Sequence, residues 1–142
     1  MKRNIFTMMV AALVSLFALT SCEKDPDPAE LIVGKWTVTS MSVTVDGVTQ
    51  EKNPIEEGVA ATYTFKADGT GETIEEIGDE KMGYTFTYSV FTSGDKQILG
   101  ITFEGDTANF EILTLDENTL VFSREAVESG HTISWTTRLK RS

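Results

Sequence analysis

Few residues in this chain could carry out chemistry. The sequence contains one cysteine and one histidine, whereas zinc and iron–sulfur sites need three or four thiolate or imidazole ligands. A serine hydrolase arrangement would have to use His131 as its base, because the chain has no other histidine. The acidic pairs Glu56-Glu57 and Glu75-Glu76 are adjacent in sequence, so in a strand the two carboxylates of each pair point to opposite faces. We therefore expect a protein that is not an enzyme and binds no metal or cofactor.

The single cysteine, Cys22, follows a segment that is typical of an export signal. Met1–Asn4 is short and basic, and Ile5–Leu19 is apolar but shorter than the roughly 20 residues that span a bilayer. The tetrad Leu19-Thr20-Ser21-Cys22 resembles the bacterial lipobox, whose cysteine is acylated. We interpret residues 1–21 as a cleaved lipoprotein signal helix and Cys22 as the lipidation site. The alternative is an ordinary secretory signal with an incidental cysteine.

The segment behind Cys22 predicts a tether rather than a packed element. Residues 22–30 carry acidic side chains and two prolines but no large apolar residue, which favours an extended chain. Acyl chains on Cys22 would anchor the protein to a membrane. The acidic stretch resembles the surface-export signal of Bacteroidetes lipoproteins, from which Lys24-Asp25 departs. We expect an outer-membrane location, in either leaflet, and the net charge of −10 argues against nucleic acid as a partner.

Residues 31–142 predict a single all-β domain. Alternating segments rich in Thr, Val, Ile and aromatic residues are separated by turns such as Asp46-Gly47 and Ser129-Gly130. The predicted strands are Gly34–Val45, Val48–Glu51, Ala60–Lys66, Gly71–Ile77, Gly83–Phe91, Lys96–Phe103, Ala108–Leu115, Thr119–Arg124 and His131–Lys140. Eight or nine consecutive antiparallel strands favour an up-and-down meander that closes into a barrel, since closure removes exposed strand edges. We expect the domain to be a monomer.

The alternation also predicts which face is the core. One face of the predicted sheet gathers nearly all the aromatic side chains, and the other is rich in Thr and charge, as a sheet over one core requires. The inward set is Tyr63, Phe65, Tyr84, Phe86, Tyr88, Val90, Leu99, Ile101, Phe103, Phe110, Ile112, Leu120, Phe122, Ile133, Trp135 and Leu139. In the first strand, Trp36 and Val38 fit one phase, whereas Met41 and Val43 fit the other. A β-bulge near Ser40 would reconcile the two phases.

Several motifs together resemble one family. The first strand opens with Gly34-Lys35-Trp36, a hairpin runs from Tyr63 to Gly71, and a later segment runs from Phe110 to Phe122. This ordered set is similar to the lipocalin-like domains of short Bacteroidetes lipoproteins. The resemblance implies an eight-stranded lipocalin-like barrel in which Gly34 and Trp36 close one end. It also implies that an arginine of the last strand lies across Trp36, with Arg138 as the first candidate and Arg124 as the second.

Two functions remain open at this point. In the first, the barrel binds a small apolar or amphipathic molecule in a shallow pocket at its mouth, because the inward rings would fill most of the interior. The phenols of Tyr63, Tyr84 and Tyr88 would supply the polar groups of that pocket; the alternative is that they are ordinary core residues. In the second, the barrel is a packed scaffold that meets a protein or glycan through exposed loops. These loops are Glu51–Val59, Gly78–Met82 and Ala126–Gly130.

Overall fold

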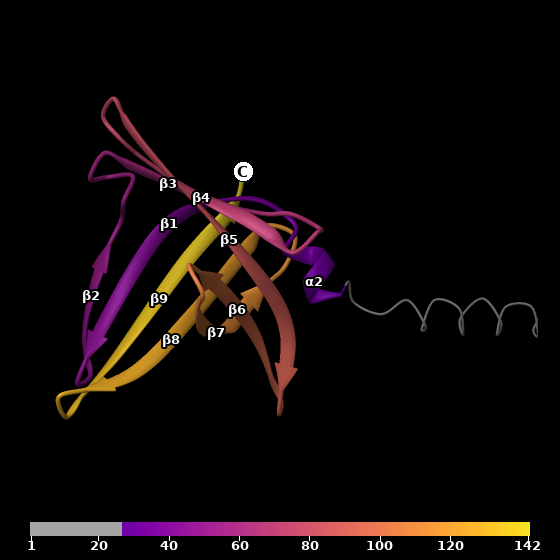
Figure 1. Ribbon diagram of the computed structural model, residues 1–142. Helices are drawn as coiled ribbons and strands as arrows, with labels where there is room; N and C mark the ends of the chain where they lie inside the picture. Colours follow the sequence, from indigo (N-terminus) through magenta and orange to yellow (C-terminus); the bar gives the residue numbers. More distant parts are fainter. Residues whose placement is uncertain (1–26) are drawn as a thin grey trace, which may run out of the picture.

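The computed structural model describes residues 27–142, which form nine antiparallel strands and one helical turn (Figure 1). The predicted signal peptide and Cys22 lie outside the described residues. The strands are β1 Gly34–Val45, β2 Val48–Lys52, β3 Val59–Phe65, β4 Thr70–Ile77, β5 Glu80–Ser93, β6 Lys96–Phe103, β7 Asp106–Leu115, β8 Thr119–Glu128 and β9 His131–Arg141. All nine predicted strands are confirmed. The largest differences are in β5 and β8, which extend further than the alternation indicated.

The chain enters the barrel through a short helix, α2 (Pro28–Leu31). The side chain of Asp27 accepts a hydrogen bond from the Ala29 amide at 3.0 Å, and Pro28 occupies the first turn, where its missing N–H is not needed. The prediction of an extended tether is therefore wrong for Pro28 to Glu30. The capping residue and the proline favour a helical turn there. In the described part of the chain, no helix has the length and hydropathy that a bilayer crossing requires.

Eight of these strands close into a barrel. Each of β3 to β8 pairs with the next strand along the chain, and β1 pairs with both β3 and β9. β2 is a ninth strand that pairs with β1 alone and lies at the left of Figure 1. The register of the β1–β9 pair shifts between Val38 and Ser40, which confirms the predicted bulge. Such a bulge bends β1 so that it can complete the closed sheet.

Three long strands change neighbours along their length, so the barrel is tight at one end and open at the other. β1 pairs with β3 over Gly34–Thr37 but with β2 over Met41–Val45. β5 pairs with β4 up to Thr87 and with β6 from Thr87 onward. β8 pairs with β7 only as far as Ser123 and continues beside β9 alone. The turns between β4 and β5, β6 and β7, and β8 and β9 all lie at the open end.

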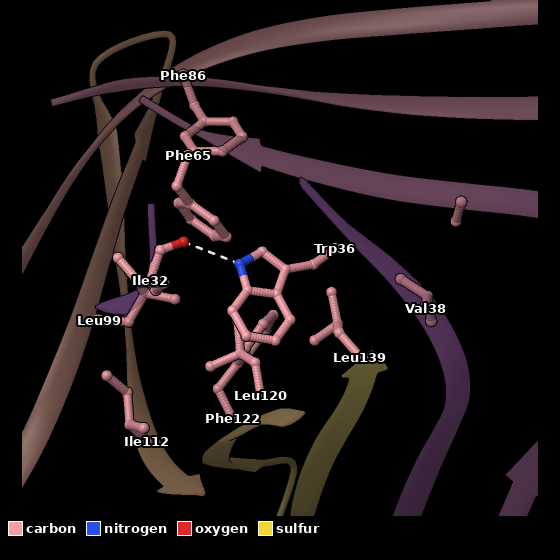
Figure 2. Close-up of a cluster of buried hydrophobic side chains, with 11 residues drawn as sticks. Ile32, Trp36, Val38, Phe65, Phe86, Leu99, Ile112, Leu120, Phe122 and Leu139 are labelled. Atoms are coloured by element: carbon pink, nitrogen blue, oxygen red, sulfur yellow. Dashed lines mark hydrogen bonds between the residues drawn. The ribbon is translucent and has the colours of Figure 1, made fainter. Parts of the chain in front are cut away.

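The core fills the tight end. Trp36 is fully buried, and its indole nitrogen donates a hydrogen bond to the Ile32 carbonyl at 2.8 Å (Figure 2). With Ile32, the other members of this buried apolar cluster are Val38, Ala61, Phe65, Phe86, Leu99, Ile112, Leu120, Phe122 and Leu139. Most belong to the predicted inward set, so the inward alternation is confirmed. Ile32, which follows α2, is a core residue that strand periodicity could not indicate.

A different arginine from the predicted one covers Trp36. The guanidinium carbon of Arg141 lies 4.2 Å from the centre of the indole, whereas Arg138 is exposed. Arg141 pairs directly with Trp36 across β1 and β9, so both side chains are on the same face. Arg138 is adjacent to the inward Leu139 and must therefore point outward. The assignment of Arg138 as the closing residue was wrong.

Arg141 also ties three chain segments together. Its guanidinium donates hydrogen bonds to the carbonyls of Leu31 at 2.6 Å and Val33 at 2.9 Å, and to that of Glu117 at 2.6 Å. Gly34 has a φ of +136°, and a Cβ at that position would lie 2.4 Å from the Arg141 Nη1 atom. The backbone conformation and the closeness of Arg141 thus both require glycine at position 34. Gly34 and Trp36 both lie at the closed end of the barrel.

Candidate ligand-binding site

The open end of the barrel contains a cavity of about 410 Å³ between β4–β5 and β6–β7. It exists because β5 pairs with β6 only from Thr87 onward. The start of β5, which carries Tyr84, and the end of β6, which carries Phe103, are therefore not paired and diverge. These two rings meet edge to face, with centroids 5.8 Å apart. The cavity is lined by Tyr63, Thr73, Tyr84, Phe86, Ile101, Phe103, Glu104, Asp106, Ala108 and Phe110.

The wall of this cavity, which we call the mouth cavity, is mainly apolar. The ring of Tyr63 lies between Phe86 and Phe122, with centroid distances of 6.3 and 6.0 Å. Tyr84 is 43% exposed and Phe103 is 39% exposed, although both belong to the inward face. Large rings left half-uncovered on a concave apolar surface are typical of a binding pocket rather than of a finished core.

The mouth cavity also has polar groups at distinct depths. Burial raises the pKa of the Tyr63 hydroxyl, and the negative charge of Glu75 raises it further. This phenol is therefore neutral at physiological pH and can donate or accept a hydrogen bond. Glu104 and Asp106 lie at the β6–β7 turn beside the entrance. The site thus combines a half-buried phenol with two carboxylates near solvent.

Comparison with known proteins identifies the domain that carries this cavity. Residues 32–122 match the family model of the lipocalin-like domain. The chain belongs to this family. The lipocalin-like barrel thus includes the segment from the buried Ile32 to the core residue Phe122. No curated protein matches the sequence.

Solved structures similar to this lipocalin-like barrel include three animal proteins. A deswapped triple mutant of bovine odorant-binding protein is 17% identical and has a TM-score of 0.46, covering 79% of this chain and 74% of its own. The bovine lipocalin allergen Bos d 2 is 17% identical with a TM-score of 0.48, covering 82% and 75%. Lobster apocrustacyanin A1 is 15% identical with a TM-score of 0.46, covering 90% and 67%.

The three predicted tyrosines do not form one site in the lipocalin-like barrel. Tyr63 and Tyr84 line the mouth cavity, but Tyr88 does not. The Tyr88 hydroxyl donates a hydrogen bond to the Lys66 carbonyl at 2.6 Å, and its ring packs on Phe65 with centroids 5.0 Å apart. Burial raises the pKa of Tyr88, and the charge of Asp68 adds to the effect. Tyr88 stabilises the β3–β4 turn through this hydrogen bond, so its assignment to the ligand pocket was wrong.

The sequence reasoning missed the residues that the β6–β7 hairpin contributes. Phe103, Glu104 and Asp106 all line the mouth cavity. Phe103 was predicted to point inward, but nothing in the alternation indicated that it stops short of the core. Its position directly before the Glu104-Gly105 turn was the available signal, because the turn places the last inward ring of β6 at the barrel rim.

A second cavity of about 340 Å³ lies beside β1, β2 and β3. It is lined by Met41, Val43, Gln50, Lys52, Pro54, Glu57, Val59, Ala61 and Glu75. Glu75 lies two residues from Thr73 on β4, so both side chains face the barrel interior and the two cavities are neighbours along β4. At the open end of the lipocalin-like barrel, the mouth cavity therefore lies toward β5 and the second cavity toward β3, with β4 between them.

The only histidine has a structural contact. His131 Nδ1 lies 2.5 Å from a carboxylate oxygen of Asp46, and the backbone amide of Thr132 donates to the other oxygen at 3.1 Å. These contacts join the β1–β2 turn to the β8–β9 turn. Within residues 27–142, no group of three or more His, Cys, Asp or Glu side chains could hold a metal ion.

Proposed function

We propose that this lipocalin-like protein binds a small apolar or amphipathic molecule in the mouth cavity. The observation that carries the proposal is the concave apolar wall in which Tyr84 and Phe103 remain partly uncovered. A volume of about 410 Å³ falls within the range of roughly 300–1,000 Å³ that small-molecule sites occupy. We further propose that the protein is not an enzyme, because its one histidine is engaged with Asp46 at a turn.

The exposed rings give the expected binding energy its scale. An aromatic side chain presents roughly 150–250 Å², and about two fifths of Tyr84 and Phe103 is uncovered. Covering each ring would therefore contribute roughly 2 kcal/mol at about 25 cal/mol per Å². The Tyr63 hydroxyl would orient a polar group of the ligand.

Native mass spectrometry and displacement of a neutral fluorescent probe test this function on the Cys22→Ser chain, which cannot be acylated. We expect a panel of ten-carbon molecules to bind and Phe103→Ser to weaken binding about tenfold or more. Phe91→Ser is the matched control, because Phe91 is 42% exposed but does not line the mouth cavity. A bare mass throughout the panel, with no probe displacement, would refute ligand binding.

We also propose that acyl chains on Cys22 anchor the protein to the outer membrane. The support is the tetrad Leu19-Thr20-Ser21-Cys22, which places the only cysteine of the chain directly after an apolar export segment. More than one acyl chain is needed for stable anchoring. Metabolic labelling with an alkyne fatty acid should mark the wild-type chain and leave Cys22→Ser unmarked. Equal labelling of the two chains would contradict the assignment.

One observation favours a second function, docking of a protein or glycan through the loops. Each of the three loop segments noted from the sequence has a large apolar side chain exposed to solvent: Ile55, Met82 and Val127. Crosslinking in intact cells discriminates between the two functions. Partners that are lost when the three side chains are changed to serine, with ligand binding intact, would favour docking.

A further inference from the structure

We infer that the mouth cavity selects an apolar cation, such as an alkylammonium or arylammonium molecule, over the corresponding anion. The inference rests on the proposed function, since it names the ligand class of the same cavity. Its basis is the combination of aromatic walls with carboxylates that no cation in the cavity neutralises.

The charged side chains that line the mouth cavity are Glu104 and Asp106, and no Lys, Arg or His is among its lining residues. Within residues 27–142, the ion pairs are Lys81–Glu76, Lys96–Glu111 and His131–Asp46. Neither Glu104 nor Asp106 takes part in them. The entrance therefore carries negative charge that a ligand cation could neutralise.

The walls provide the second component of cation recognition. Five rings line the cavity, Tyr63, Tyr84, Phe86, Phe103 and Phe110. The face of an aromatic ring attracts a cation, and an ammonium group withdrawn from water gains most from this contact. Phe103 directly precedes Glu104 in the chain, so one hairpin brings a ring and a carboxylate to the same edge of the cavity. An ammonium group at this edge could contact both.

The negative potential extends beyond the entrance. Glu75 faces the interior from β4, and after burial its charge is the next largest cause that raises the pKa of Tyr63. The cations in this region lie in other depressions. Lys66 shares with Glu104 a groove on the other side of β5, and Lys52 lines the second cavity together with Glu57 and Glu75. Neither lysine lines the mouth cavity.

A fatty-acid anion would meet the opposite conditions. Its carboxylate would be placed near Glu104 and Asp106, and the neutral hydrogen-bond donors in the lining are the hydroxyls of Tyr63, Tyr84 and Thr73. Hydroxyls do not offset the loss of hydration and the like-charge repulsion of a carboxylate. A neutral alcohol of the same chain length should bind with intermediate affinity.

Three probes of equal chain length test the inference on the Cys22→Ser chain: decyltrimethylammonium, decanol and decanoate. Each is used below its micelle concentration to displace a neutral fluorescent probe. We expect decyltrimethylammonium to bind about tenfold tighter than decanol, within the roughly two- to thirty-fold range of a cation–π contact. Decanoate should bind more weakly than decanol. Raising the salt concentration should reduce the preference for the ammonium probe.

Variants test whether the carboxylates at the entrance cause the preference for the ammonium probe. Glu104→Gln with Asp106→Asn should reduce the preference for decyltrimethylammonium over decanol about threefold or more, because only the rings then attract the cation. An unchanged urea unfolding midpoint shows that the barrel of this variant is folded. Asp95→Asn with Glu128→Gln removes the same charge at positions that do not line the cavity. This control should keep the preference.

The outcomes separate the inference from the proposed function. If decanol binds and all three probes bind equally, or decanoate binds best, the charge selectivity is wrong and ligand binding stands. An undiminished preference in the Glu104/Asp106 variant would overturn the assignment to these carboxylates. If none of the three probes displaces the fluorescent molecule, both the proposed function and the inference fail.

Discussion

Arg141 should contribute more to stability than any other exposed or half-buried cation of the last strand. Changing Arg141 to Met removes the guanidinium that lies 4.2 Å from the Trp36 ring centre. It also leaves the carbonyls of Leu31 and Val33, both at the closed end, without their charged donor. The cation–π contact is worth roughly 0.5–2 kcal/mol, and losing partners of half-buried carbonyls costs about 1–3 kcal/mol more. We therefore expect a loss of about 3 kcal/mol.

Urea unfolding followed by tryptophan fluorescence measures this loss. With a slope of about 1–3 kcal/mol per molar urea, the unfolding midpoint of Arg141→Met should fall by roughly 1–3 M. Arg138→Met is the matched control on the same strand. Its side chain is exposed on the outer face, so the change should stay within about 0.5 kcal/mol. Arg141→Lys should be intermediate, since an ammonium keeps the charge but cannot reach several carbonyls with a planar fork.

Equal destabilisation by Arg141→Met and Arg138→Met would refute this reasoning. So would a normal midpoint for Arg141→Met. Either result would mean that the closed end does not depend on the guanidinium over Trp36.

Two further changes test the packing and the electrostatics of the barrel. Gly71→Ala should cost about 2–3 kcal/mol of stability, because a Cβ there would lie 2.5 Å from the Phe86 ring. Gly83→Ala is the control and should be tolerated, because its Cβ would meet nothing closer than 3.9 Å. Equal urea midpoints for the two variants would contradict the core geometry. Burial, and then the charge of Glu75, raise the pKa of Tyr63 in the folded protein. The unfolded chain therefore loses this proton at a lower pH than the folded protein does. The contribution of Tyr63 to stability is complete below pH about 10 and is lost as the pH rises above that value. Tyr63→Phe should lose less stability between pH 9 and pH 11 than the wild type, and identical pH profiles would count against a buried Tyr63.

The strands were predictable because each one carries its own signal. Asp46-Gly47 and Ser129-Gly130 mark turns locally, and the alternation of residues such as Tyr63 and Phe65 marks the inner face without knowledge of the partner strand. The bulge was predictable for the same reason, since the phase change around Ser40 lies within one strand. Local signals fail at α2, where acidic residues and prolines fit a tether as well as a capped helical turn.

The site was less predictable because it depends on where strands separate. Inward and outward side chains alternate equally well in both halves of β5. The sequence therefore does not indicate that β5 pairs with β4 before Thr87 and with β6 after it. That exchange leaves Tyr84 at an open mouth and Tyr88 in contact with Phe65. The error at Arg138 was avoidable. The inward phase of Leu139 already required an outward Arg138 and allowed an inward Arg141.

The most direct test of the account is the position of a bound ligand. Nuclear Overhauser effects between decanol and aromatic side chains of the Cys22→Ser chain locate it without perturbing the barrel. We predict contacts from the alkyl chain to Tyr63, Tyr84 and Phe103, and none to Phe91 on the outer face. Contacts to Phe91 alone, or no contacts at saturating decanol, would contradict the claim that the open end of this barrel is a ligand site.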